Sequence, residues 1–150
     1  MWRAHARLKT LCAVGFAAAA ALPLSGCGVA TRAGAQTPAR GVAVTERDFH
    51  ISAPKALAAG NVRLNLYNAG PDQHELLVAR VGGNASLPLR GDGLTVDEER
   101  IQAATLVTLE PGAPGLRREV DLHLTPGRYV LFCNMSGHYL GGMHTDLVVR

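Results

Sequence analysis

Hydrophobic and polar residues alternate along much of the chain after residue 40. In Asn61–Asn68 apolar residues take every second position, and Arg117–Leu124 ends in the same pattern, which is typical of strands with one buried face. Glycine, proline and asparagine separate these runs and indicate turns. The pattern predicts eight strands, over Gly41–Thr45, Phe49–Ser52, Asn61–Asn68, Glu75–Val81, Ala104–Leu109, Arg117–Leu124, Arg128–Cys133 and Thr145–Val149.

Many short strands at this spacing are typical of an all-β protein, and we expect a Greek-key β-sandwich or barrel of about seven to eight strands.

One segment does not follow this pattern of short strands. Gly82–Gly93 has the composition of a loop, and Thr95, followed three residues later by Glu98, has the form of a capping box. We therefore expect a short helix over Val96–Ala103, as an excursion from one edge of the sandwich.

The first 40 residues have a different character. Met1–Lys9 is basic and Thr10–Leu24 is apolar but too short for an ordinary membrane span, which is typical of a secretory signal rather than a retained helix. Leu24-Ser25-Gly26-Cys27 resembles the bacterial lipobox, in which the cysteine is lipidated; cleavage nearby without a lipid is the alternative. We divide the chain into a lipoprotein-type signal peptide (1–26), a flexible tether (27–40) and one domain (41–150).

Export changes the meaning of the net charge. The formal charge is +3, from 15 basic and 12 acidic residues, but Arg3, Arg7 and Lys9 lie in the predicted signal. Without them the two signs balance. No basic patch with interleaved aromatic residues is evident, so we expect no nucleic-acid partner.

The three cysteines have separate roles in this interpretation. Cys12 lies in the predicted signal and Cys27 in the lipobox, which leaves Cys133 as the domain's single thiol. Exported proteins usually pair their cysteines, so a lone thiol needs an explanation. It is either an inert buried side chain or part of a chemical site.

The residues after Cys133 favour a metal site. His138 and Met143 follow at steps of five residues, in a loop rich in glycine. Upstream, the strand Asn61–Asn68 runs to one end of the sandwich, the chain crosses there, and His74 begins the returning strand. Asn134–Met143 makes the same kind of crossing after the strand that ends at Cys133. If both crossings lie at one end of the sandwich, His74 faces the other three side chains. Two imidazoles, a thiolate and a weak thioether form the trigonal centre of blue-copper proteins.

The domain as a whole resembles the cupredoxins, the plastocyanin and azurin class, and most closely their small exported bacterial members. The resemblance rests on Asn68-Ala69-Gly70 before His74-Glu75-Leu76, and on Pro126-Gly127-Arg128-Tyr129 before Cys133-Asn134-Met135-Ser136-Gly137-His138-Tyr139-Leu140-Gly141-Gly142-Met143. It implies a Greek-key β-sandwich, one type 1 copper ion and single-electron transfer between larger redox proteins. Many relatives have asparagine directly after the upstream histidine, so Glu75 is expected to change the hydrogen bonding around the thiolate.

Four other side chains near these positions are expected outside the ligand set. His144 follows Met143, and neighbouring side chains in an extended segment point apart. His50 and His123 lie in strand-like runs and are expected at the surface, whereas Met135 is expected to pack against the core.

Three other kinds of site fit the sequence less well. The binuclear copper site of oxidase subunits needs two cysteines four residues apart, and position 137 is glycine. Zinc rarely takes a thioether ligand. A hydrolase with Cys133 as nucleophile and His138 as base leaves His74 and Met143 unexplained.

We therefore expect an electron carrier rather than an enzyme. It would be exported to the periplasm or cell surface, tethered by lipid to a membrane, monomeric, and would exchange electrons with cytochromes or membrane oxidoreductases. The ring edge of His138 is the expected electron exit, within an apolar docking patch formed by Tyr139, Leu140, Gly141 and Gly142. The main alternative is a copper-binding protein for delivery or resistance, which transfers the metal itself and for which the same ligands would serve.

Overall fold

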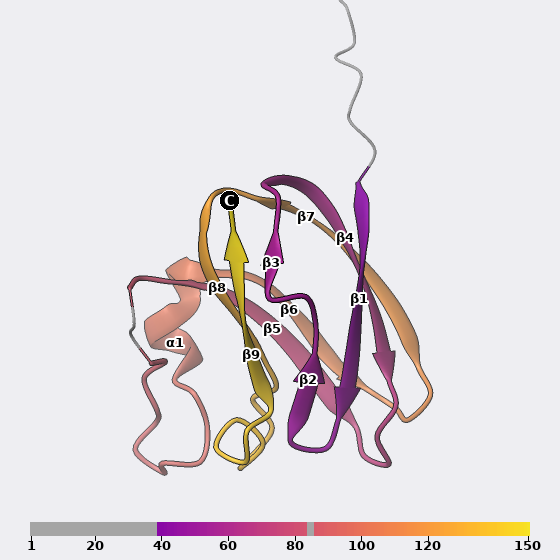
Figure 1. The fold of residues 1–150 in the computed structure, drawn as a ribbon. Coiled ribbons are helices and arrows are strands. Elements are labelled where there is room, and N and C mark those ends of the chain that lie inside the picture. Colours follow the sequence, from indigo (N-terminus) through magenta and orange to yellow (C-terminus); the bar gives the residue numbers. More distant parts are fainter. Residues whose placement is uncertain (1–38, 84–85) are drawn as a thin grey trace, which may run out of the picture. The chain divides into compact units, whose positions relative to one another are not determined.

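A computed structural model describes residues 39–83 and 86–150 as two packed β-sheets with one short helical excursion (Figure 1). The predicted signal peptide, Cys27 and almost all of the predicted tether lie outside these residues. Among the described residues no helix is long and apolar enough to cross a membrane.

The first sheet has the strand order β2-β1-β4-β7 and the second has the order β3-β9-β8-β5-β6. β1 pairs with β4, and β3 with β9, in parallel; the other pairs are antiparallel. The strands are β1 (Arg40–Arg47), β2 (His50–Ser52), β3 (Ala56–Leu57), β4 (Gly60–Asn68), β5 (His74–Val81), β6 (Thr105–Gly112), β7 (Arg117–Leu124), β8 (Gly127–Phe132) and β9 (His144–Val149).

All eight predicted strands are present, and the prediction of an all-β sandwich is confirmed. The ninth strand, β3, was missed because two residues are too few to show a period. The prediction about the crossings was half right. The segment between β4 and β5 passes from one sheet to the other, but the segment between β8 and β9 joins neighbouring strands of a single sheet.

The main core lies between the facing sheets. In β4 the side chains of Val62, Leu64 and Leu66 are buried while those of Arg63 and Asn65 are exposed, as the alternation predicts. The three buried side chains pack with apolar residues of the second sheet in one cluster. The hydrophobic period of this strand therefore determines which of its faces meets the other sheet.

β5 departs from alternation because the excursion covers its outer face. The four consecutive residues Leu76–Ala79 are fully buried. Leu77 and Ala79 belong to a second cluster, with Val96 and Ile101 of the excursion. A strand covered on both faces has a continuous apolar run, and this one leads directly away from His74.

The helix of the excursion is shorter than predicted and begins at a different cap. α1 spans Glu98–Ile101 and a 3₁₀ turn, η1, spans Gln102–Ala104. Asp97, not Thr95, is the N-cap, and its carboxylate accepts the Arg100 amide at 3.2 Å. The capping-box prediction was therefore wrong, because Thr95 is engaged in a turn with Asp92.

We expect Asp97→Ala to lower the free energy of unfolding by about 1 kcal/mol, the usual cost of losing a cap. The matched control is Thr95→Ala, which leaves the observed cap in place and should cost clearly less. Urea unfolding followed by circular dichroism measures both changes. A larger loss for Thr95→Ala than for Asp97→Ala would contradict the assigned cap.

Candidate metal centre

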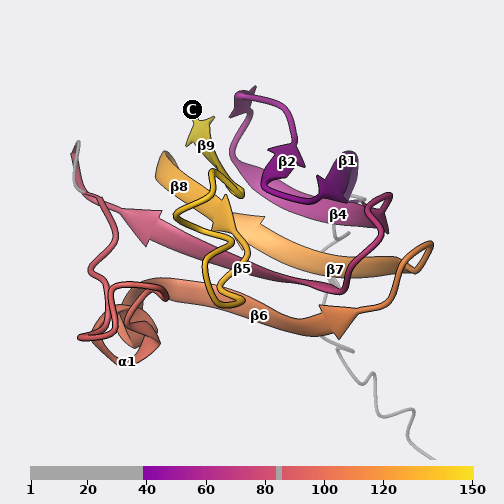
Figure 2. The same ribbon diagram turned by 90° about the horizontal axis from the view of Figure 1, so that it is seen from below.

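Three segments far apart in the sequence meet at one end of the sandwich. The turn between β1 and β2, the β4–β5 crossing and the β8–β9 loop all lie at the lower end in Figure 1, and Figure 2 views the molecule from that side. His74 is the first residue of β5, and Cys133 directly follows β8. His138 lies in the β8–β9 loop, and Met143 ends that loop.

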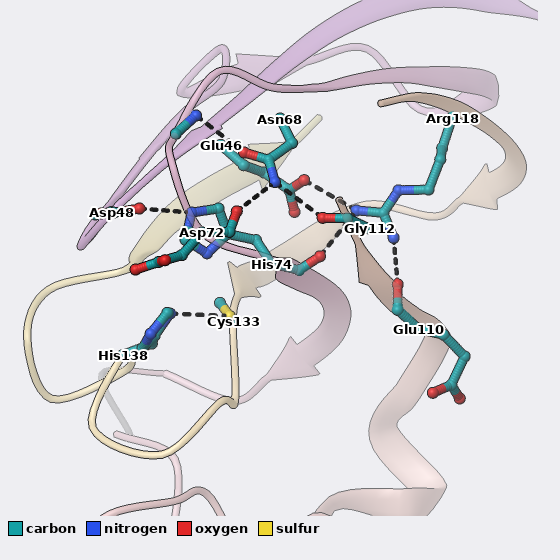
Figure 3. A network of polar contacts seen from close by, with 11 residues as sticks. Glu46, Asp48, Asn68, Asp72, His74, Glu110, Gly112, Arg118, Cys133 and His138 are labelled. Carbon is teal, nitrogen blue, oxygen red and sulfur yellow. Dashed lines mark hydrogen bonds and ion pairs between the residues drawn. The ribbon is translucent and has the colours of Figure 1, made fainter. Parts of the chain in front are cut away.

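The ligand atoms of His74, Cys133 and His138 lie within 4.8 Å of one another. His74 and Cys133 are fully buried and His138 is half-buried. Figure 3 shows the two imidazoles and the thiol around one point, with His138 Nδ1 3.5 Å from Cys133 Sγ. The sequence prediction that these three side chains converge is therefore confirmed.

His74 has one nitrogen committed and one available. Its Nε2 lies 2.9 Å from Asp48 Oδ1, while its Nδ1 is buried without a hydrogen-bond partner. Burial lowers the pKa of His74, in spite of the nearby Asp48 and Asp72 carboxylates, and so favours the neutral imidazole. With the proton on Nε2, the Nδ1 lone pair is free, and a bound metal ion would remove the cost of leaving it unpaired.

The surroundings of Cys133 act on the pKa of its thiol in two opposite directions. Burial raises its pKa to about 11, so the thiol of the metal-free chain is protonated at neutral pH. The backbone N–H groups of Met135 and Glu75 donate to the sulfur, and these hydrogen bonds lower the pKa. Such donors stabilise a thiolate once a metal ion has displaced the proton.

Backbone hydrogen bonds close the β8–β9 loop on itself. The Cys133 amide donates to the Met143 carbonyl at 3.1 Å, and the Met143 amide donates to the His138 carbonyl at 2.9 Å. Gly137 and Gly142 adopt φ angles of 80° and 104°, which favour glycine. The loop therefore fixes the spacing of Cys133 and His138 without a metal ion.

Met143 is fully buried in the same apolar cluster as Cys133. Its backbone carbonyl accepts the Cys133 amide, so the Met143 backbone lies beside that of Cys133. Its role as the axial ligand stays a prediction.

Asn68 shapes the crossing that leads to His74. Its buried side chain donates to the carbonyls of Asp72 (2.7 Å) and Gly112 (2.9 Å) and accepts from the Gly70 amide (2.9 Å). This side chain therefore holds both ends of the crossing to β6, and His74 follows in a fixed position.

Behind His74 lies a buried ion pair between two strands of the first sheet. Arg118 of β7 donates to a carboxylate oxygen of Glu46 in β1 at 2.9 Å, and also to the backbone carbonyls of His74 and Glu110. Burial raises the pKa of Glu46 to about 7, although Arg118 acts in the opposite direction. A side chain at position 112 would collide with the Arg118 guanidinium, which explains the glycine there.

Glu75, the departure from the family pattern, ties the ligand loop to the excursion. Its carboxylate accepts the backbone N–H of Asn134, and burial raises its pKa. The Asn134 side chain in turn accepts the Val96 amide and donates to the Val96 carbonyl at 3.0 Å and to Glu98 at 2.7 Å. The segment around Cys133 is therefore anchored from two sides.

The structure also adds residues that the sequence reasoning missed. Asp48 contacts His74, and the Phe49 ring lies against His138, with centroids 5.4 Å apart. The sequence pattern places Phe49 at the start of a strand and assigns no role to Asp48. Their contacts span more than 20 residues, so no local pattern could have revealed them.

The other histidines of the described residues, and Met135, lie where they were expected. His50 and His123 are exposed, and His144 is exposed with its ring against Tyr139. Met135 is half-buried and packs against the core cluster.

Solved structures of auracyanins and of rusticyanin have the same fold. Auracyanin B has a TM-score of 0.57 and 25% identity, with 77% of this chain and 91% of that chain covered. A reduced auracyanin from Roseiflexus castenholzii has a TM-score of 0.56 and 18% identity, with 76% of this chain and 99% of that chain covered. Rusticyanin from Thiobacillus ferrooxidans has a TM-score of 0.54 and 14% identity, with 77% of this chain and 80% of that chain covered. No protein-family model and no curated protein matches the sequence.

The chain therefore has the cupredoxin fold, and its cluster fits a single type 1 copper ion. The fit rests on the donors themselves. A buried thiol and two imidazoles suit both copper oxidation states. The buried Nδ1 of His74 has no hydrogen-bond partner, so its lone pair is available to a metal ion.

The raised pKa of Glu46 predicts a pH dependence of stability. Between about pH 4.5 and 7 the unfolded chain has lost the proton that folded Glu46 retains, so the free energy of unfolding falls as pH rises. The full effect is roughly 3 kcal/mol. We expect Glu46→Gln to remove this part of the slope, as measured by urea unfolding of the metal-free protein at pH 5 and pH 8.

The matched control is Glu119→Gln, because Glu119 is an exposed carboxylate of the same sheet, paired with Arg63 at 3.8 Å. It should leave the slope as in the wild type. An unchanged slope in Glu46→Gln would show that Glu46 is ionised throughout this range.

Proposed function

We propose that this protein is an extracytoplasmic electron carrier that holds one type 1 copper ion between His74, Cys133 and His138, with Met143 as the weak axial ligand. The observation that carries the proposal is the cluster itself: three donor atoms within 4.8 Å, one of them a nitrogen without a hydrogen-bond partner. When bound, copper supplies a one-electron couple, reduced by a donor protein and reoxidised by an acceptor protein.

The surrounding chain suits rapid electron exchange because it limits movement of the ligands. His74 begins a strand in the middle of a sheet, and Cys133 follows the neighbouring strand. The loop hydrogen bonds hold His138 relative to both. A site that keeps one geometry in two oxidation states needs little rearrangement when the electron moves.

His138 is the natural electron exit because it is the one residue of the three-ligand cluster that is not fully buried. Three large apolar side chains near it, Phe49, Leu94 and Leu140, are 52%, 47% and 52% exposed. Phe49 lies against the His138 ring, and the Leu94 carbonyl accepts the Gly137 amide within the ligand loop at 3.1 Å. We call these three side chains the apolar rim.

The apolar rim enlarges the docking patch expected from Tyr139–Gly142. A small apolar surface around an exit favours brief contacts with redox proteins, for which we propose cytochromes or membrane oxidoreductases. We further propose that the chain is exported, works as a monomer and is held at a membrane by a lipid on Cys27. The support for export and lipidation is the sequence of the first 27 residues.

Redox cycling at measured copper occupancy tests the proposed function. The copper-loaded protein is reduced with ascorbate and reoxidised with ferricyanide several times, in the presence of a Cu(I) chelator. An electron carrier keeps its copper through each cycle, as measured by atomic absorption after desalting. Loss of copper to the chelator at each reduction would contradict electron carriage and favour copper delivery.

A pair of variants locates the exit. Leu140→Glu places a charge in the apolar rim and should slow electron self-exchange at least tenfold, as measured by NMR line broadening. Leu106→Glu is the control, because Leu106 is also exposed but lies in β6 at the end remote from His74. Equal rates for the two variants would contradict an exit at His138.

A further inference from the structure

The two-residue turn between β1 and β2 contacts both histidines of the cluster. Asp48 Oδ1 lies 2.9 Å from His74 Nε2, and the Phe49 ring lies against His138. The two imidazole rings are themselves 5.3 Å apart. Figure 3 shows Asp48 on the side of His74 opposite the thiol. Adjacent residues of one turn thus hold one histidine each, from outside the ligand set.

Glycines at the facing positions make room for these contacts. A Cβ at position 70 would lie 2.8 Å from both Asp48 Oδ1 and His74 Nε2. At position 141 a Cβ would overlap the Phe49 ring. A side chain at either position would force the turn away from the histidines.

The backbone at Phe49 supports a role beyond turn formation. Its φ is 57°, and among the described residues it is the one non-glycine with a positive φ. A bulky residue in this region is strained by about 1 kcal/mol or more, and glycine or asparagine would relieve that strain. Because Phe49 is half exposed, core packing does not account for it. Its contacts with His138 and Gly141 do.

We propose that the Asp48–Phe49 turn is the positioning element of the metal centre: Asp48 fixes the tautomer and donor strength of His74, and Phe49 keeps the His138 ring in place. The proposal rests on copper binding as the proposed function. Neither residue belongs to the three-residue cluster, so both are positioning residues.

Asp48 acts through the imidazole. Accepting the Nε2 proton leaves the Nδ1 lone pair directed at the cluster, before any metal is present. A carboxylate partner also makes the imidazole a stronger donor, which favours Cu(II) over Cu(I). Asp48 thus raises affinity and lowers the reduction potential.

Phe49 acts by covering the ligand that is most accessible. His138 is the half-buried histidine of the cluster, and its departure would open the centre to solvent. The Phe49 ring covers part of the imidazole and rests on Gly141 of the loop. It therefore slows the loss of Cu(I) to competing ligands.

Asp48→Asn tests the first half of the proposal. We expect Cu(II) affinity to fall at least tenfold with a smaller change for Cu(I), so that the potential rises by about 59 mV for each tenfold difference. The control is Asp72→Asn, which removes a nearby charge that also acts on His74 but makes no hydrogen bond to its ring. Equal shifts in the two variants would overturn the role of the hydrogen bond.

The metal-free protein gives a second readout. ¹⁵N NMR of the wild type should show His74 as the Nε2–H tautomer, and Asp48→Ala should populate the other tautomer. A wild type with Nδ1–H on His74 would overturn the proposal.

Phe49→Ala tests the second half. We expect transfer of Cu(I) to a chelator to be at least tenfold faster than in the wild type, and Phe49→Tyr to restore the slow rate. Leu106→Ala is the control, since Leu106 is also an exposed apolar side chain but lies in β6 at the end remote from His74. A rate in Phe49→Ala equal to that in Leu106→Ala would overturn the role of Phe49.

The two levels of the account fail in different ways. If the wild-type protein binds no copper with a thiolate ligand, the proposed function is wrong. If it binds copper normally and the Asp48 and Phe49 variants behave like their controls, only the positioning role is wrong.

Discussion

The metal centre depends on the antiparallel pairing of β5 with β8. This pairing carries Leu77 opposite Phe132, and both strands reach the same end of the sandwich with one buried ligand each. The Glu75 amide then donates to Cys133 Sγ, so the sheet hydrogen bonding continues into the ligand set. Because both strands lie inside the second sheet, the separation of His74 and Cys133 is as rigid as the sheet itself.

Around this pair, each ligand is held by a group from another part of the fold. Arg118 of the first sheet bonds the His74 carbonyl, Asp48 bonds its ring, and Asn134 fastens the loop after Cys133 to the excursion. The burial of Glu46 beside Arg118 is costly, as its raised pKa shows. These contacts, like the unpartnered Nδ1 of His74, are understandable if the chain must present a nearly finished site to a metal ion.

The sequence was sufficient for the fold class and for the three converging ligands, but not for what surrounds them. Alternation in Asn61–Asn68 is a local signal, and the spacing of Cys133 and His138 lies within one loop. The contacts of Asp48 and Phe49 depend on how the first sheet packs against the second, which no period records. The helix-cap prediction failed because Thr95 and Asp97 could both serve as the cap. Thr95 is held in a turn with Asp92, and the Val96 amide donates to Asn134, which leaves Asp97 as the cap.

The central claim is that Cys133 binds copper as a thiolate within a site built by the fold. Titration of the purified protein with Cu(II), followed by its visible spectrum, tests this most directly. The account predicts an intense thiolate-to-copper charge-transfer band that saturates at one copper ion per chain and is lost in Cys133→Ser. Absence of the band in the wild type, or its persistence in Cys133→Ser, would contradict the account.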